Sequence, residues 1–326
     1  MGFSNSVKLQ TQIHLDPEEN QIDYSSKILL LGSCFSENVG AKFDYFKFQN
    51  LQNPFGIIFN PISMERLVIR AIDNNLFSER DVFQYNGIWK CFEAHSQLSS
   101  LNKIEILSNL NKALQDLREA LQTSTHIIFT FGTSFVYRHI EIDRIVANCH
   151  KLPQKIFKKE LLSIDAISKS IQKSVETITS LNPTASIIFT ISPVRHIKDG
   201  FAENTLSKAH LISAIQGFLN LKSSKVNHQS FYFPSYEIMM DELRDYRFYS
   251  EDMIHPNKTA IEIIWEKFSK VWISSKTESL QQTIASVQSG LLHKPFNSKS
   301  TEHLEFVERL QHQITSLKNQ LPHIKF

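Results

Sequence analysis

The sequence predicts a doubly wound α/β fold, in which helices cover both faces of a mostly parallel sheet. Short apolar runs rich in Ile, Leu and Phe recur along the chain, and their length is that of buried parallel strands. The segments between these runs carry apolar residues three and four positions apart, which is the spacing of an amphipathic helix. Strands that alternate with helices are typical of this fold class, and 326 residues suffice for one such domain with an appended segment.

Four strands and three long helices are predicted for this domain. The strands are expected at residues 27–31, 125–131, 186–191 and 230–233. The helices are expected at residues 103–121, 164–181 and 206–219. A further helix is expected soon after the first strand, at residues 38–43.

Two segments are expected to leave the main sheet. Residues 82–92 contain the dipeptide Asn86-Gly87 between alternating residues, and Asn-Gly readily adopts the positive φ angles of a two-residue hairpin turn. This segment is therefore predicted to be a β-hairpin. Residues 137–147 have a similar strand-like composition without a comparable turn signal, and they predict a second excursion.

The C-terminal part of the chain is predicted to be a helical extension. After Trp272 the composition becomes rich in Ser, Thr and Gln, and apolar residues then recur at helical spacing at Val307, Leu310, Ile314, Leu317 and Leu321. We therefore divide the chain into a main domain, 1–275, and an extension, 276–326. The apolar seam covers about two heptads, fewer than a coiled coil needs, so packing on the main domain and homo-oligomer formation both stay open.

Composition limits the classes of partner. The chain has 35 Lys and Arg against 33 Asp and Glu, a formal charge of +2, which argues against a nucleic-acid partner. No run approaches the roughly 18 apolar residues of a membrane span, and residues 1–20 lack the apolar region of a signal peptide. We expect a cytoplasmic protein without a membrane partner and without a cofactor.

The three cysteines do not form a recognisable metal or disulfide pattern. Cys34, Cys91 and Cys149 are far apart and none belongs to a CxxC pair, so no metal site is predicted. A zinc site built from these cysteines with His150 and His255 is the alternative.

The strongest candidate for a reactive residue is the turn Gly32-Ser33-Cys34-Phe35, which directly follows the first predicted strand. Ligands of open α/β sheets bind at the carboxyl ends of strands, where a helix N-terminus also favours negative charge. A thiol at Cys34 would therefore be partly ionised. The alternative is that Cys34 is a small buried hydrophobic residue.

A possible base for this nucleophile lies far downstream. Asp252 precedes His255 by three residues on a predicted loop before the last helix. A nucleophile needs a base within hydrogen-bond reach, and that base needs a partner that fixes its tautomer. His255 and Asp252 can fill these two roles. Alternatively, His255 is only a neighbour of a helix that Asn257 caps.

Several motifs together resemble one known family. They are GSCF at 32–35, NPFG at 53–56, TFGT at 130–133, NCHK at 148–151, SPVRH at 192–196, the run 199–208, YFPSYE at 232–237 and DMIHPN at 252–257. The chain resembles the GSCFA family over nearly its whole length, to about Asn297. That family is similar to the SGNH/GDSL hydrolases, so the resemblance implies a three-layer, flavodoxin-like α/β/α sheet, a nucleophile in the first block, an oxyanion hole and a C-terminal DxxH pair.

Alignment of these motifs assigns roles residue by residue. The family's nucleophilic serine falls on Cys34, which implies a cysteine nucleophile and leaves Ser33 as the reserve candidate. The oxyanion glycine of the second block falls on Gly56. The alternative is that Gly56 is a turn glycine.

The third block departs from the pattern, because Ser134 stands where an asparagine is expected. An oxyanion can be stabilised by any well-placed N–H or O–H donor, so Asn148, Asn60 or Ser134 could replace the missing amide, and Asn148 is preferred. His150, Arg195 and His196 lie on predicted loops and could bind a carboxylate or phosphate; a structural ion pair is the alternative.

These assignments predict an ester or thioester hydrolase. His255 would take the proton of Cys34, and the thiolate would attack a carbonyl carbon of a small acyl substrate. Transfer of the acyl group to an alcohol or amine instead of water would make the protein an acyltransferase. The missing asparagine favours a third interpretation, a ligand-binding module that has lost efficient catalysis.

Overall fold

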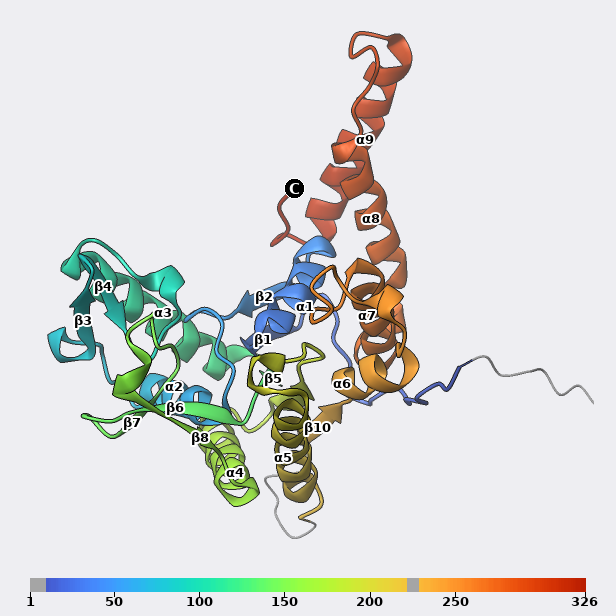
Figure 1. The fold of residues 1–326 in the computed structure, drawn as a ribbon. Helices are drawn as coiled ribbons and strands as arrows, with labels where there is room; N and C mark the ends of the chain where they lie inside the picture. Colours follow the sequence, from blue (N-terminus) through green and yellow to red (C-terminus); the bar gives the residue numbers. More distant parts are fainter. Residues whose placement is uncertain (1–9, 222–228) are drawn as a thin grey trace, which may run out of the picture.

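The protein folds around a five-stranded parallel sheet, and the apolar runs predicted four of its strands (Figure 1). The computed structural model describes residues 10–221 and 229–326. The strand order is β10-β9-β5-β1-β2. The bounds are β1 Lys27–Gly32, β2 Gln49–Gln52, β5 His126–Phe131, β9 Ser186–Ile191 and β10 Ser230–Phe233. Read in chain order, this is the 2-1-3-4-5 arrangement of flavodoxin-like doubly wound sheets.

Helices cover both faces of the sheet, which makes three layers. Ile28 and Leu30 of β1 pack into one core, together with side chains of α1 and α7. Leu29 and Leu31 point to the opposite face and pack against α2, α3, α4 and α5. The alternation follows from the two-residue period of a strand. The helix bounds are α1 Cys34–Tyr45, α2 Pro61–Ile72, α3 Lys103–Thr123, α4 Ile164–Leu181, α5 Phe201–Leu219, α6 Ser235–Glu237 and α7 Lys258–Trp272.

The predicted core elements are confirmed, with differences at a few ends. Helix α5 begins at Phe201 rather than at residue 206, directly after Gly200, whose φ of 115° suits a glycine. Strand β2 was not predicted, because its residues Gln49–Gln52 are mostly polar and only half-buried at the edge of the sheet. Helix α2 was also missed, although Asn60 at its N-cap and Pro61 at its first position are ordinary start signals.

Both predicted excursions are present beside the sheet. Strands β3 Val82–Tyr85 and β4 Ile88–Cys91 form the expected hairpin, and Asn86 and Gly87 have φ angles of 51° and 75°. The second excursion is a three-stranded antiparallel sheet of β6 Phe135–His139, β7 Arg144–Val146 and β8 Phe157–Leu161.

The C-terminal extension is a helical hairpin that projects from the domain (Figure 1). Its helices are α8 Glu278–Leu292 and α9 Thr301–Gln320. Leu310, Ile314 and Leu317 are buried in the same core as α1 and α7, so this half of the predicted seam packs on the main domain. Val307 nearer the tip is 46% exposed. In the described part of the chain, no helix is both long and apolar enough to cross a membrane.

Candidate active site

The Gly32-Ser33-Cys34 turn lies where the strand order reverses direction, between β1 and β5. In open α/β sheets this switch point leaves a crevice at the carboxyl ends of the strands. Main-chain contacts hold the turn against β5 and the loop after β2. The N–H of Ser33 donates to the Thr130 carbonyl oxygen over 3.1 Å, and the N–H of Gly32 donates to Asn53 Oδ1 over 2.8 Å.

Only a glycine fits at position 32. Its φ is 151°, a value that side chains with a Cβ rarely adopt. A Cβ at this position would also lie 2.3 Å from the Thr130 carbonyl oxygen. The glycine therefore lets β1 approach β5 closely at the point where the candidate nucleophile begins α1.

The structure distinguishes Ser33 from Cys34 by their surroundings. Ser33 is fully buried, and its Oγ accepts a hydrogen bond from the N–H of Phe35 over 3.3 Å, so it caps α1. Cys34 is the first residue of that helix and is partly exposed. Of these two residues, Cys34 is the one that an incoming ligand can reach.

The thiol of Cys34 does not have the environment that we expected. Burial raises its pKa, and the charge of Glu37 acts in the same direction. The N–H groups of Cys34 and Phe35 and the cation of Lys208 lower the pKa, but the net shift is upward. The prediction of a partly ionised thiol considered only the helix N-terminus and left out desolvation.

Asp252 and His255 form the predicted pair. His255 Nδ1 and Asp252 Oδ2 are 2.6 Å apart, and the two side chains are 47% and 45% exposed. Oδ1 of Asp252 also accepts the N–H groups of His255 and Ile254, over 3.0 and 2.9 Å. The N–H of His255 is the first cause of an Asp252 pKa of about 2. Since the carboxylate occupies Nδ1, Nε2 is the ring nitrogen that can exchange a proton with a substrate.

This pair belongs to a loop that is fixed next to the end of β9. The N–H of Arg195 donates to the Ile254 carbonyl oxygen over 3.3 Å, and Asn257 caps α7 through the N–H of Ala260. The capping role considered for Asn257 is thus confirmed alongside the pair. Within the described residues no hydrogen bond joins His255 to Cys34.

Sequence reasoning missed Lys208, a buried lysine on α5. It is 1% exposed, and its Nζ donates to the Ser192 carbonyl oxygen over 2.7 Å. Burial lowers the pKa of Lys208 to about 7, while Cys34 and Glu237 act in the opposite direction. Lys208 shares the buried stripe of α5 with Leu211 and Ile215. The spacing of Lys208 from Leu211 and Ile215 places it on the apolar face of the helix, and this spacing could have indicated a buried lysine.

His196 lies beside Lys208 on the loop after β9. Burial lowers the pKa of His196 to about 3, and the cations of Lys208 and His255 add to this effect. Its Nε2 is buried without a hydrogen-bond partner, and a Cβ on Gly132 would lie 3.3 Å from that nitrogen. The ring packs edge-on against Phe59, with the centroids 5.4 Å apart. The result is a neutral imidazole with one unused nitrogen directed inward.

Arg195 precedes His196 and also has an unused group. Its guanidinium lies 5.2 Å from the centre of the Phe201 ring, and its Nε is buried without a hydrogen-bond partner. Among the described residues, no salt bridge includes Arg195 or His196, so the alternative of a structural ion pair has no support there.

Three predicted oxyanion residues take part in structural hydrogen bonds, and Gly56 and Ser134 use their donor groups in them. The N–H of Gly56 donates to the Asn53 carbonyl oxygen over 2.7 Å, as in a turn. Asn60 Oδ1 accepts the N–H of Ser63 over 2.9 Å and so caps α2. Ser134 is fully buried, and its Oγ donates to the Ser207 carbonyl oxygen over 3.0 Å.

Asn148 and His150 make their contacts with the excursions. Asn148 Oδ1 accepts the N–H of His150 over 2.7 Å, and His150 Nε2 lies 2.6 Å from the Cys91 carbonyl oxygen. Burial lowers the pKa of His150. No group of three or more His, Cys, Asp or Glu side chains in residues 10–221 and 229–326 could hold a metal ion.

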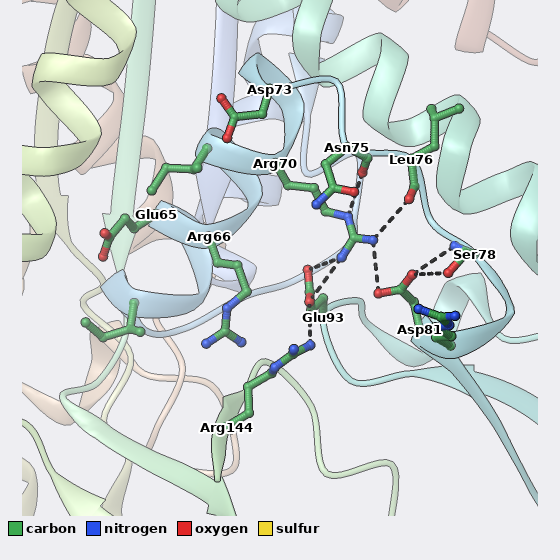
Figure 2. A pocket seen from close by; sticks show the side chains of 13 residues that line it. Glu65, Arg66, Arg70, Asp73, Asn75, Leu76, Ser78, Asp81, Glu93 and Arg144 are labelled. Carbon is green, nitrogen blue, oxygen red and sulfur yellow. Dashed lines mark hydrogen bonds and ion pairs between the residues drawn. The ribbon is translucent and has the colours of Figure 1, made fainter. Parts of the chain in front are cut away.

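A charged cavity of about 510 Å³ lies elsewhere, beside α2 and β7 (Figure 2). Its charged lining residues are Glu65, Arg66, Arg70, Asp73, Arg80, Asp81, Glu93 and Arg144. The lining thus contains four cations and four anions, which leaves no excess charge to attract an ionic ligand. The Cys34 turn is not part of this lining.

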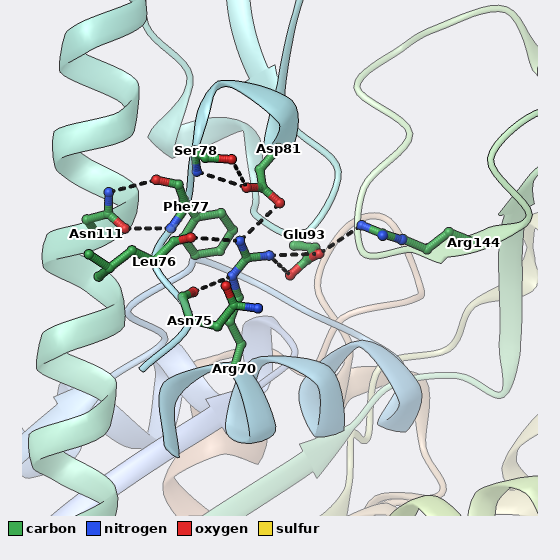
Figure 3. A network of polar contacts seen from close by, with 9 residues as sticks. All are labelled: Arg70, Asn75, Leu76, Phe77, Ser78, Asp81, Glu93, Asn111 and Arg144. Carbon is green, nitrogen blue, oxygen red and sulfur yellow. Dashed lines mark hydrogen bonds and ion pairs between the residues drawn. The ribbon is translucent and has the colours of Figure 1, made fainter. Parts of the chain in front are cut away.

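The central ion pairs of that cavity have a structural role (Figure 3). Arg70 is buried and contacts both carboxylate oxygens of Glu93 at 3.2 Å and Asp81 at 3.0 Å. Arg144 reaches the same Glu93 carboxylate at 3.3 Å. Because Asp81 precedes β3, Glu93 follows β4 and Arg144 begins β7, these pairs connect both excursions to α2.

Comparison with known families gives two matches. A family model described as "GSCFA family" matches residues 27–268, which include the Gly32–Cys34 turn, Lys208 and the Asp252–His255 pair. A second model, described as "GSCFA domain protein, C-terminal domain", matches residues 284–326, most of the helical hairpin. No curated protein matches the chain.

Proposed function

The chain belongs to the GSCFA family, and we propose that it cleaves an ester or thioester through a thiol nucleophile at Cys34. The observation that carries the proposal is the convergence of three elements on one edge of the sheet. Cys34 follows β1, Lys208 binds the main chain just after β9, and the loop with Asp252 and His255 is hydrogen-bonded to the same region. The likeness of the family to SGNH/GDSL hydrolases, inferred from the sequence, supports the same reaction class.

The reaction proceeds through an acyl-enzyme. Sγ of Cys34 forms a bond to the carbonyl carbon while the thiol proton passes to a base, and the bond to the leaving alcohol or thiol breaks. The leaving group takes a proton from the enzyme. A water molecule then attacks the thioester, and Nε2 of His255 accepts its proton while Asp252 stabilises the imidazolium. Release of the acid restores the thiol of Cys34.

His196 is the donor that we propose for the oxyanion. A neutral imidazole can donate a hydrogen bond from Nε2, and this nitrogen is buried without a partner beside Gly132. Gly56 is less suited, because its N–H already donates to Asn53 within a turn. Asn148 lies by the excursions, where its oxygen accepts the N–H of His150. One such donor contributes about 3 kcal/mol to transition-state stabilisation.

The first experiment detects the acyl-enzyme. The purified protein is mixed with short-chain p-nitrophenyl esters and acyl thioesters, and intact mass and peptide mapping locate any acyl group. We expect an adduct on Cys34 that accumulates in His255→Ala and is absent from Cys34→Ser. Cys149→Ser is the matched control, because Cys149 is also partly exposed and burial raises its pKa to about 11.

A ligand-binding module is the second candidate, and one observation favours it. Burial raises the pKa of the Cys34 thiol, and no hydrogen bond to His255 is formed within the described residues. If neither an adduct nor turnover is found with any ester or thioester, the binding function is preferred. An adduct on Ser33 in the Cys34→Ser protein would instead revive the reserve nucleophile.

If the adduct forms but water releases it slowly, an added alcohol or amine should be tested as the acceptor. Faster release with the acceptor, together with the acylated product, would identify an acyltransferase.

A further inference from the structure

Lys208 is the most unusual charged side chain near the candidate nucleophile. A lysine that is 1% exposed normally has an ion-pair partner. Here Nζ donates one hydrogen bond to a neutral carbonyl, that of Ser192, although an ammonium group has three hydrogens to donate. No salt bridge to Nζ exists within the described part of the chain.

The position of Nζ follows from the sheet. Ser192 comes directly after β9, and its N–H donates to the Phe131 carbonyl oxygen at the end of β5 over 2.8 Å. The N–H of Ser33 donates to Thr130, one residue earlier on β5. Lys208 and Cys34 thus lie on the two sides of the same strand end, and each alters the pKa of the other.

Three other groups lie near Nζ or act on it. Glu237 lies close enough for its charge to act on Lys208, but its carboxylate accepts the hydroxyl hydrogen of Tyr232, and burial raises its pKa. The Tyr236 ring centre lies 5.3 Å from Nζ. His196 is neutral at physiological pH and adds no positive charge. Within the described residues no salt bridge therefore fixes Lys208 as a permanent ammonium, and burial leaves it able to exchange a proton near neutral pH.

We propose that Lys208 is a catalytic base that accepts the proton of the Cys34 thiol, directly or through one bridging water. This inference rests on the proposed function and divides its proton transfers between two groups. The pair of Asp252 and His255 is half-exposed, so solvent can reach it in the second step. Lys208 is shielded from solvent and lies close enough to Cys34 for each group to alter the pKa of the other.

The step is balanced as follows. The proton of the Cys34 thiol moves to the neutral amine of Lys208, which becomes an ammonium as Sγ bonds to the carbonyl carbon. When the bond to the leaving group breaks, the ammonium returns this proton to the departing oxygen or sulfur, directly or by way of water. His255 then serves the hydrolysis of the acyl-enzyme. A base whose pKa lies near the working pH is the efficient choice for such a transfer.

The test measures the thiol itself and does not depend on turnover. The rate of Cys34 alkylation by iodoacetamide is followed from pH 6 to pH 10 in the wild-type chain and in Lys208→Met, with peptide mapping. We expect the alkylation rate of Cys34 at pH 7.5 to fall by about 10-fold in Lys208→Met. The midpoint of the curve of alkylation rate against pH should move to higher pH. His255→Ala should label within about twofold of wild type while its deacylation slows.

A second variant excludes a merely structural role. Lys208→Ala leaves space beside Ser192, and added ethylamine should restore part of the labelling rate in proportion to the concentration of neutral amine. Unchanged labelling in Lys208→Met, or a rate in Lys208→Ala that ethylamine does not change, would overturn the proposal. Labelling that depends on Lys208 without turnover of any ester would reject hydrolysis and keep Lys208 as the base. Ester turnover that Lys208→Met leaves unchanged would keep hydrolysis and reject Lys208 as the base.

Discussion

Replacement of Lys208 by methionine should make the protein more stable at neutral pH, and the gain should shrink as the pH rises. Burial lowers the pKa of this amine from its ordinary value of 10.5 to about 7. Between these two values the unfolded chain binds more protons than the folded chain, so the stability of the wild type increases with pH in this window. Methionine has a similar length and no proton to bind, so the variant lacks this dependence.

The size of the effect follows from the two pKa values. Their difference, 10.5 − 7 = 3.5, corresponds to about 5 kcal/mol of folding free energy. About 4 kcal/mol of this penalty is present at pH 7, and about 2 kcal/mol remains at pH 9. The variant also leaves the Ser192 carbonyl without its hydrogen bond, which costs about 1–3 kcal/mol at every pH. The expected net gain is therefore about 1–3 kcal/mol at pH 7 and close to zero at pH 9.

The assay is urea unfolding of both proteins at pH 7, 8 and 9, followed by tryptophan fluorescence. The difference in unfolding free energy between Lys208→Met and wild type should fall by about 2 kcal/mol over this range. Lys112→Met, on the exposed side of α3, is the matched control, and its difference from wild type should not vary with pH. A Lys208→Met difference that is constant from pH 7 to pH 9 would refute the reasoning.

Three further predictions concern the pair, the ion network and the turn. Asp252→Asn should lower the rate of ester turnover by roughly 10²- to 10⁴-fold, because His255 loses the anion that stabilises its protonated form. A loss below about threefold in a steady-state assay would contradict the proposed role of the pair. Arg70→Met should lower the free energy of unfolding in urea by about 3–5 kcal/mol, because the buried Glu93 carboxylate loses its main partner. Arg144→Met should lower it by less than about 1 kcal/mol, because the Arg144 side chain is 49% exposed. Equal losses in the two variants would show that the network is not organised around Arg70. Gly32→Ala should lower the free energy of unfolding by more than about 2 kcal/mol, because the added Cβ would lie 2.3 Å from the Thr130 carbonyl oxygen. An unchanged midpoint of urea unfolding would argue against a tight turn.

The fold could be predicted well because its core elements are local patterns. The runs at Ser186–Ile191 and Ser230–Phe233 were predicted with their exact bounds, since a buried parallel strand is apolar on both faces. The edge strand Gln49–Gln52 has no such run, because its mostly polar side chains are only half-buried, and its pairing with β1 is not visible in the sequence. The projecting hairpin was predicted as helix, but its division between a buried base and an exposed tip depends on contacts with α1 and α7.

For the candidate site, the sequence by itself determined the features that depend on neighbours in the chain. The Gly32 turn after an apolar strand and the spacing of Asp252 and His255 could both be read directly, and both are formed. Tertiary structure alone decided which turn residue is accessible, because only the cap of α1 shows that the buried Ser33 hydroxyl is occupied. It also decided which polar groups are free, since His196 keeps an unused nitrogen.

The environment of Cys34 and Lys208 depends on segments that are far apart in the sequence. Desolvation at the sheet edge raises the pKa of one and lowers that of the other, and this comes from the combined packing of α1, α5 and the loop after β9. A local pattern specifies which face of a helix is buried. It does not specify which charges from other segments meet on that face, and their mutual distances and loss of water set the chemistry of this site.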